Sequence, residues 1–161
     1  MGQKINPIAF RLGVNKGWDS IWFAKKKEFG KYLIEDFKIR KYIQKNILNS
    51  GVSDIIIERS GKKLIVSIHT SRPGFVIGKK GADIEKIKSN VLKISKDNEI
   101  TINIKEIKKP ELNSYLVAEN IATQLVKRIA YRRAVKRGIQ SAMRLGALGI
   151  KVMVSGRLNG T

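Results

Sequence analysis

A glycine-rich turn with two central lysines constrains this sequence more than any other feature. It runs from Gly74 to Gly81 and reads Gly-Phe-Val-Ile-Gly-Lys-Lys-Gly. Glycine lacks a Cβ atom, so the backbone can adopt positive φ angles and a ligand can approach it closely. The helical pattern that follows offers unpaired N–H groups and a positive dipole end to an anion. We therefore expect a fold in which this loop opens a helix and faces an anionic ligand.

Three interpretations of the loop Gly78-Lys79-Lys80-Gly81 compete. A Gly-x-x-Gly loop that clamps about four nucleotides is the signature of KH domains, and the two lysines suit a sugar-phosphate backbone. An isolated Gly-x-x-Gly is also common as an ordinary turn. A nucleotide-binding P-loop requires Gly-x-x-x-x-Gly-Lys and then Ser or Thr. Here the spacing from Gly74 to Gly78 is one residue short and Lys80 replaces the hydroxyl, so the P-loop interpretation fails.

The charge balance indicates a polyanionic partner. The 161 residues include 33 Lys and Arg against 13 Asp and Glu, a formal net charge of +20. Self-repulsion on this scale is costly unless a polyanion neutralises it. Nucleic acid is the expected partner, and an anionic membrane surface is the lesser alternative. A hydrophobic content of 42% argues against a disordered chain.

The same composition argues against an enzyme. The chain has no cysteine and one histidine, His69, in a strand-like run, so a disulfide framework, a thiolate metal site and a Ser-His-Asp triad are excluded. We expect no catalytic residues, no metal and no cofactor. No apolar run approaches the roughly 18 residues of a membrane span, and the N-terminus lacks a signal-peptide pattern. We expect a soluble, intracellular protein.

Residues 1–28 are predicted to form an N-terminal arm. They lack clean periodicity, and Trp18, Trp22 and Phe23 are mixed among lysines. Two interpretations are equally supported: the arm becomes ordered on a partner, or it packs its aromatic side chains onto the domain that follows.

Residues 29–108 are predicted to form an α+β domain. Isoleucines four apart predict a helix from about residue 29 to 50, and β-branched alternating runs predict a hairpin of strands 52–59 and 63–70. A short apolar turn, the glycine loop, a helix carrying Ile84 to Ile94 and a strand over 100–104 follow. The order is helix, strand, strand, helix, helix, strand.

Residues 111–161 are predicted to form a second small α+β domain, after a boundary at Lys108-Lys109-Pro110. A helical stripe spans 118–129, a basic helix spans 131–145, and alternation over 150–154 predicts a last strand. On a helical wheel the basic side chains of the second helix fall within an arc of about 140°. They are Arg132, Arg133, Lys136, Arg137 and Arg144. A solvated charged face is the alternative, but a face of one sign favours phosphate binding.

Four stretches resemble one family. They are Met1 to Pro7, Arg72 to Gly81, Tyr131 to Arg137 and Gly149 to Leu158. The chain is similar, along its whole length, to the bacterial-type KH-domain protein number three of the small ribosomal subunit. The resemblance implies a type II KH domain and a structural role in the subunit head. It implies binding to rRNA, mRNA and neighbouring ribosomal proteins, in the cytoplasm or an organelle matrix.

The resemblance also assigns residues. Arg132, Arg133 and Lys136 match positions that line the mRNA entrance channel and help to unwind structured mRNA, and Arg137 adjoins them. Further basic residues are candidates for RNA contacts: Lys4, Arg11, Arg72, Lys127, Arg128 and Arg144. Family members usually continue past Leu158 with more strands, so we expect the second domain to be incomplete. A free-standing KH-domain RNA chaperone or regulator is the alternative function.

Overall fold

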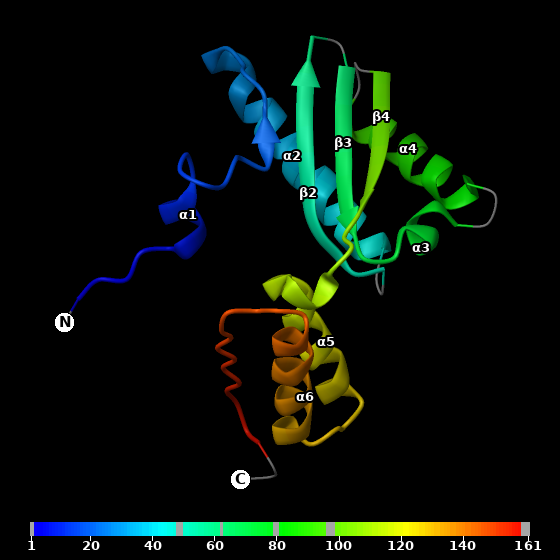
Figure 1. Ribbon diagram of the computed structural model, residues 1–161. Helices are drawn as coiled ribbons and strands as arrows, with labels where there is room; N and C mark the ends of the chain where they lie inside the picture. The colour runs from blue at the N-terminus through cyan, green and yellow to red at the C-terminus, as the bar shows by residue number, and fades with distance from the viewer. Residues whose placement is uncertain (1, 48–49, 62, 79–80, 96–98, 159–161) are drawn as a thin grey trace.

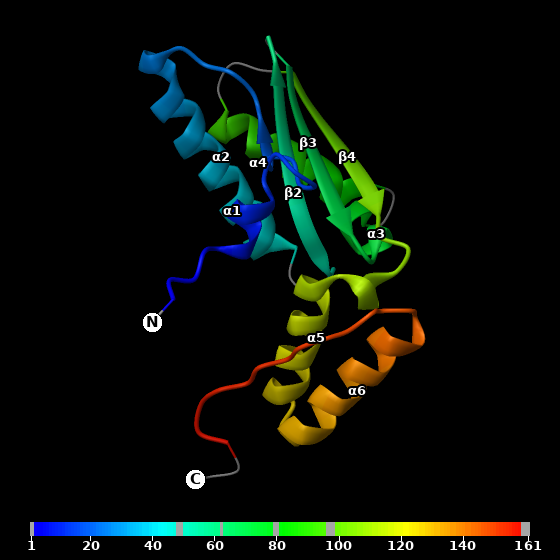
Figure 2. The same cartoon turned by 60° about the vertical axis from the view of Figure 1, so that its left-hand side comes forward.

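The structure is a computed structural model that describes residues 2–47, 50–61, 63–78, 81–95 and 99–158. It is an α+β fold, as predicted, built around one four-stranded sheet of order β1-β2-β3-β4 (Figure 1). Two helices cover one face of the sheet, and a separate helical pair lies beyond its end (Figure 2).

The sheet combines one antiparallel and two parallel pairings. The hairpin of β2 (Val52–Ser60) and β3 (Lys63–Thr70) is antiparallel and matches the predicted strands closely. β4 (Glu99–Glu106) runs parallel to β3. The parallel pair requires a crossover, and the crossover consists of α3 (Pro73–Ile77) and α4 (Ala82–Ile94). The chain thereby returns to the same edge of the hairpin with the glycine loop between the two helices.

The core lies between the sheet and its covering helices, α2 (Lys26–Asn46) and α4. Alternate residues of a strand point to one face, and the alternating Leu64, Val66 and Ile68 of β3 are fully buried. The predicted helix stripe is confirmed, since Ile39 and Ile43 of α2 are also fully buried. The predicted order of helices and strands is therefore confirmed, although α2 begins three residues earlier than expected.

The N-terminal arm has structure that the sequence did not predict. Asn6 caps a short helix, α1 (Pro7–Arg11), by accepting hydrogen bonds from two backbone N–H groups. Further on, β1 (Ser20–Ile21) pairs in parallel with β2. Both elements are too short to produce a periodic signal, which explains why pattern analysis missed them.

A buried charge network fastens the arm to the domain. Asp36 of α2 is 2% exposed, and its carboxylate accepts hydrogen bonds from Ser20 Oγ at 3.0 Å and Trp22 Nε1 at 2.7 Å. Its other oxygen binds Arg59 Nη2 of β2 at 2.6 Å. A buried carboxylate needs such partners to offset its lost hydration. Trp22 therefore packs on the domain, whereas Phe23 is 92% exposed.

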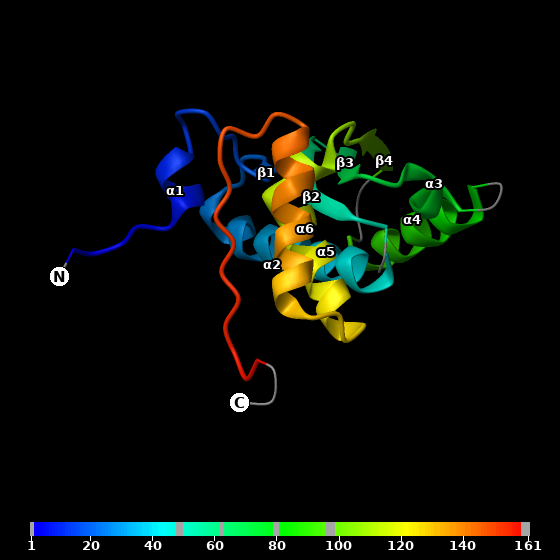
Figure 3. The same cartoon turned by 60° about the horizontal axis from the view of Figure 1, so that its bottom comes forward.

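The second helical unit is an antiparallel pair. A 3₁₀ turn at Pro110–Leu112 leads into α5 (Ser114–Val126), which is followed by α6 (Tyr131–Arg144) (Figures 1 and 3). Gly138 of α6 packs against α5: a Cβ atom there would lie 3.1 Å from Ile121 Cδ1. The small residue permits the two helices to pack tightly. None of the described helices is long and apolar enough to cross a membrane.

The predicted last strand is wrong. Residues 149–158 form no strand and run antiparallel to α6 as an extended chain (Figures 1 and 3). The alternation that suggested a strand persists, since Ile150, Val152 and Val154 are half-buried and Lys151 and Met153 are exposed. A strand requires a neighbour for its hydrogen bonds, and the described residues place none beside this segment.

Candidate nucleic-acid interface

The two glycines that bound the loop have backbone angles of the kind that glycine permits. Gly78 ends α3 with φ of 72°, and Gly81 precedes α4 in the left-handed region with φ of 79°. Both φ angles are positive. Residues other than glycine rarely adopt such angles. The loop lysines, Lys79 and Lys80, lie outside the described residues.

Gly78 is also required by close contact. A Cβ atom at this position would lie 2.1 Å from Oδ2 and 2.7 Å from Cβ of Asp83. Asp83 and Glu85 occupy the first turn of α4, where negative charge is stabilising. These acids offset the positive end of the helix. The positive charge available to a phosphate at this loop must therefore come mainly from side chains, not from the helix dipole.

Arg72 belongs to the same connection. It precedes Pro73 at the start of α3, is exposed, and its guanidinium lies 6.0 Å from the centre of the Phe75 ring. Phe75 is 69% exposed. The structure thus places an arginine and an aromatic ring on the turn that leads into the glycine loop.

The basic helix presents a surface of one charge sign in the second unit. All five predicted basic side chains of α6 are exposed, and the helix contains no acidic residue. Its opposite side packs inward through Ala134 and Ala142, which are 0% and 2% exposed. We define the basic face of α6 as Arg132, Arg133 and Lys136.

Arg132 is oriented by its neighbour. Its Nε donates a hydrogen bond to the Tyr131 hydroxyl at 3.1 Å, and its guanidinium lies 5.7 Å from the centre of that ring. The hydrogen bond and the Coulombic interaction with Tyr131 raise the pKa of Arg132. The guanidinium is therefore positively charged under all physiological conditions, and only one of its donors is used within the protein's described contacts.

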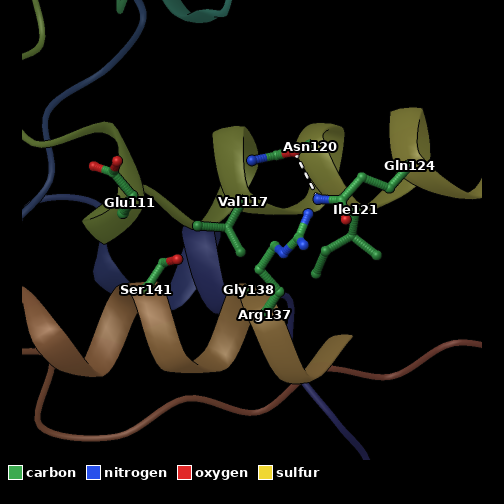
Figure 4. Close-up of a pocket in the computed structure, with 8 residues that line it drawn as sticks. All are labelled: Glu111, Val117, Asn120, Ile121, Gln124, Arg137, Gly138 and Ser141. Atoms are coloured by element: carbon green, nitrogen blue, oxygen red, sulfur yellow. Dashed lines mark hydrogen bonds between the residues drawn. The ribbon is translucent and has the colours of Figure 1, made fainter. Parts of the chain in front are cut away.

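Arg137 has a different position from the basic face. Figure 4 shows its side chain extending from α6 toward α5, into a groove of about 100 Å³. The groove is also lined by polar side chains of both helices, namely Asn120, Gln124 and Ser141, and by Glu111. Gln124 donates to Asn120 across one turn at 2.9 Å. Arg137 thus borders the helix pair, although the wheel placed it with the other four.

Lys127 and Arg128 are not on a helix, contrary to the predicted stripe over 118–129. α5 ends at Val126, and both residues lie exposed in the turn that leads to α6. Arg128 has φ of 60°, and its N–H donates to Leu125 O at 2.9 Å. The turn brings these two charges to the end at which the basic helix begins.

The remaining candidates lie in the arm and at the C-terminal end of α6. Lys4 and Arg11 are exposed in the arm, and Arg11 Nη1 donates to Pro7 O at 2.8 Å. Arg144 ends α6, where a positive charge suits the helix dipole. The candidates thus occupy three regions: the arm, the α3–α4 connection and the helical unit (Figure 1).

Two arginines have structural positions that charge counting could not reveal. Arg59 is held by Asp36 and by Glu35 Oε2 at 3.2 Å, and its side chain is 7% exposed. Arg40 donates to Asp19 O at 2.8 Å and to Ile55 O at 2.5 Å. Among the described residues, no group of three or more His, Asp or Glu side chains could hold a metal ion.

The order of elements and the glycine loop define a KH-domain protein, a class that binds RNA. A family model described as "KH domain" matches residues 38–112, and one described as "Ribosomal protein S3, C-terminal domain" matches residues 121–161.

Relatives named small ribosomal subunit protein uS3 align with 99% of this chain. The protein of Pelagibacter ubique is 71% identical over 160 residues, and the chain covers 70% of it. Those of Parvibaculum lavamentivorans and Desulfatibacillum aliphaticivorans are 57% and 53% identical, with 67% and 73% covered. The chain belongs to the family of small ribosomal subunit protein uS3. It is a structural, RNA-binding ribosomal protein, not an enzyme.

Proposed function

We propose that this chain binds rRNA in the head of the small subunit and that the basic face of α6 lines the channel through which mRNA enters. The observation that carries the proposal is the basic face itself. Arg132, Arg133 and Lys136 are exposed together on a helix without acidic residues. Arginine presents a planar fork of donors that suits phosphate oxygens.

In this proposal the basic face assists unwinding without chemistry of its own. A row of fixed cations attracts the phosphates of a single strand and thereby competes with base pairing at the channel mouth. α6 is suited to this work because its other side is anchored through Ala134 and Ala142. The charges are therefore presented on a packed helix rather than on a free loop.

We assign the binding of rRNA to regions outside the basic face of α6. The glycine loop of Gly78 to Gly81 and Arg72 would contact the phosphate backbone on one side, and Lys4 and Arg11 would do so from the arm. Lys127, Arg128, Arg137 and Arg144 supplement these contacts around the helical unit. Neighbouring ribosomal proteins are further partners, and the site of action is the ribosome of the cytoplasm or of an organelle.

A free-standing KH-domain RNA chaperone or regulator is the alternative. Such a protein would use the glycine loop but would need neither the arm nor the basic face of α6. The second matched family model, over residues 121–161, favours the ribosomal role.

The proposal is tested by changing Arg132, Arg133 and Lys136 together to alanine. All three are exposed and alanine favours helix, so the fold should persist. Purified small subunits should still contain the variant, because the rRNA contacts elsewhere remain. Translation of an unstructured message should run near the normal rate, and a stable downstream hairpin should stall it for longer. Absence of the variant from subunits would show instead that the basic face is an assembly anchor.

A further inference from the structure

A second cavity lies where the arm meets the first long helix. It measures about 270 Å³ and is lined by side chains of three elements. The arm contributes Phe23 and Lys25, α2 contributes Glu28 and Tyr32, and β2 contributes Arg59. Its size is near the lower end of the roughly 300–1,000 Å³ typical of ligand pockets. Its lining includes no residue of the glycine loop or of the basic face of α6.

One wall of the cavity is a rigid aromatic surface. The Arg59 guanidinium lies 4.6 Å from the centre of the Tyr32 ring and is itself fixed by Glu35 and Asp36. The Trp22 ring packs edge-on against Tyr32, with ring centres 5.7 Å apart. Tyr32 is therefore immobilised before any ligand arrives. Such pre-organisation lowers the entropic cost of binding.

The lining of the cavity also includes an exposed aromatic side chain, Phe23. Phe23 is 92% exposed although its neighbour Trp22 is packed. A large apolar ring left in water is unfavourable, and exposed apolar patches commonly mark binding surfaces. Phenylalanine has only two χ angles, so its side chain loses little conformational entropy when it is ordered against a flat ligand.

The charges around the cavity favour a nucleobase over a phosphate as the group bound inside it. Glu28 lines it, and the charge of Arg59 is balanced by Glu35 and Asp36. The charges that line the cavity, Glu28, Lys25 and the ion-paired Arg59, therefore give no surplus of positive charge for a phosphate. Lys26 and Lys27 follow the lining residue Lys25 in the chain; all three are exposed, and we call them the lysine rim. A neutral, flat group is favoured inside and an anionic chain outside.

We propose that this cavity accepts one unpaired nucleobase of RNA, stacked on Phe23, while the lysine rim holds the flanking phosphates. Aromatic side chains interleaved with lysines are the usual platform for single-stranded RNA. The cationic rim and the net charge of +20 favour this polyanion over an apolar segment of a protein. The site goes beyond the proposed function, which assigns no contact to Phe23 or Tyr32.

The experiment is photo-crosslinking of the full chain to a ten-nucleotide single-stranded RNA that contains 4-thiouridine, with crosslinked peptides identified by mass spectrometry. Crosslinks are expected on the peptide that holds Phe23. Phe23→Ala should weaken their formation about 5- to 150-fold in an RNA titration, the range expected for one base–aromatic stack. Phe23→Trp should restore it. Phe37→Leu is the matched control and should leave crosslinking unchanged. Phe37 lies on α2 and, like Phe23, is exposed, but it does not line the cavity.

Phe23→Leu separates stacking from apolar contact. It keeps the apolar surface but removes the π-face, so it should behave like Phe23→Ala. Retention of full crosslinking by Phe23→Leu would overturn the proposal and indicate an apolar, protein-type contact. Crosslinks on α6 without any at Phe23 would also overturn it, while leaving the proposed function standing. Crosslinks at neither surface would contradict both.

Discussion

Asp36 shows how a single residue can determine the position of a whole segment. Its carboxylate accepts hydrogen bonds from Ser20 and Trp22 of the arm and pairs with Arg59 of β2. Nothing in the sequence pattern indicates this role, because an acidic residue within a lysine-rich helix resembles any other surface charge. Only the fold brings its partners, 14 to 23 positions distant, to the same place.

We predict that Asp36→Ala lowers the free energy of unfolding by about 3–5 kcal/mol, because it leaves Arg59 buried without its main counter-ion. Denaturation in urea, followed by Trp22 fluorescence and by circular dichroism, measures the loss. Asp54→Ala is the control, since Asp54 is exposed and its hydrogen-bond partner among the described residues is the neighbouring Ser53, and it should change stability by less than about 0.5 kcal/mol. A loss below about 1 kcal/mol for Asp36→Ala would show that the network contributes little.

The two loop glycines allow a second comparison at this scale. Both have positive φ, but only Gly78 would bring an added Cβ against Asp83. Gly78→Ala should therefore cost about 1–3 kcal/mol more stability than Gly81→Ala, which carries only the backbone strain. Thermal unfolding of both variants at one pH tests this. Equal losses of stability in the two variants would mean that the Asp83 side chain moves aside without a cost in free energy.

At the scale of elements, the sequence predicted a helix or strand correctly wherever its own residue pattern was sufficient to define it. The hairpin of β2 and β3, the stripe of α2 and the amphipathic α6 were predictable because each repeats over eight residues or more. β1 and the segment after Gly149 were not, since strand formation there depends on a neighbour that local sequence does not specify. The same limit applies to Arg137, whose orientation depends on where α5 lies.

The basic face of α6 should act as three phosphate contacts. Arg132, Arg133 and Lys136 changed together to alanine should lower the magnitude of the slope of log affinity against log salt by about 2, at roughly 0.7 for each single-strand contact. Fluorescence anisotropy with a single-stranded RNA measures the slope. Lys41, Lys45 and Lys93 changed together to alanine form the charge-matched control, because all three are exposed on α2 and α4. An equal effect of the two triple variants on the slope would show that the basic face of α6 is no more than a general cationic surface.

At the scale of the whole molecule, the candidate RNA-binding residues are spread over the arm, the α3–α4 connection and the helical unit, which occupy different parts of the molecule (Figure 1). A net charge of +20 over 161 residues makes the free protein self-repelling. A particle rich in RNA resolves this by surrounding the chain with phosphates. Affinity for RNA should consequently fall about 10³-fold or more between 50 and 200 mM salt if six or more phosphates are neutralised. A nearly flat salt dependence would contradict an interface dominated by phosphates.

The most direct test of the central claim is sedimentation of a tagged form of this chain expressed in bacterial cells, in sucrose gradients at moderate salt. The account predicts that the chain travels with the small ribosomal subunit in near-equimolar amount and is released only as salt rises. A chain that stays at the top of the gradient with small RNAs, while other small-subunit proteins sediment normally, would contradict the account.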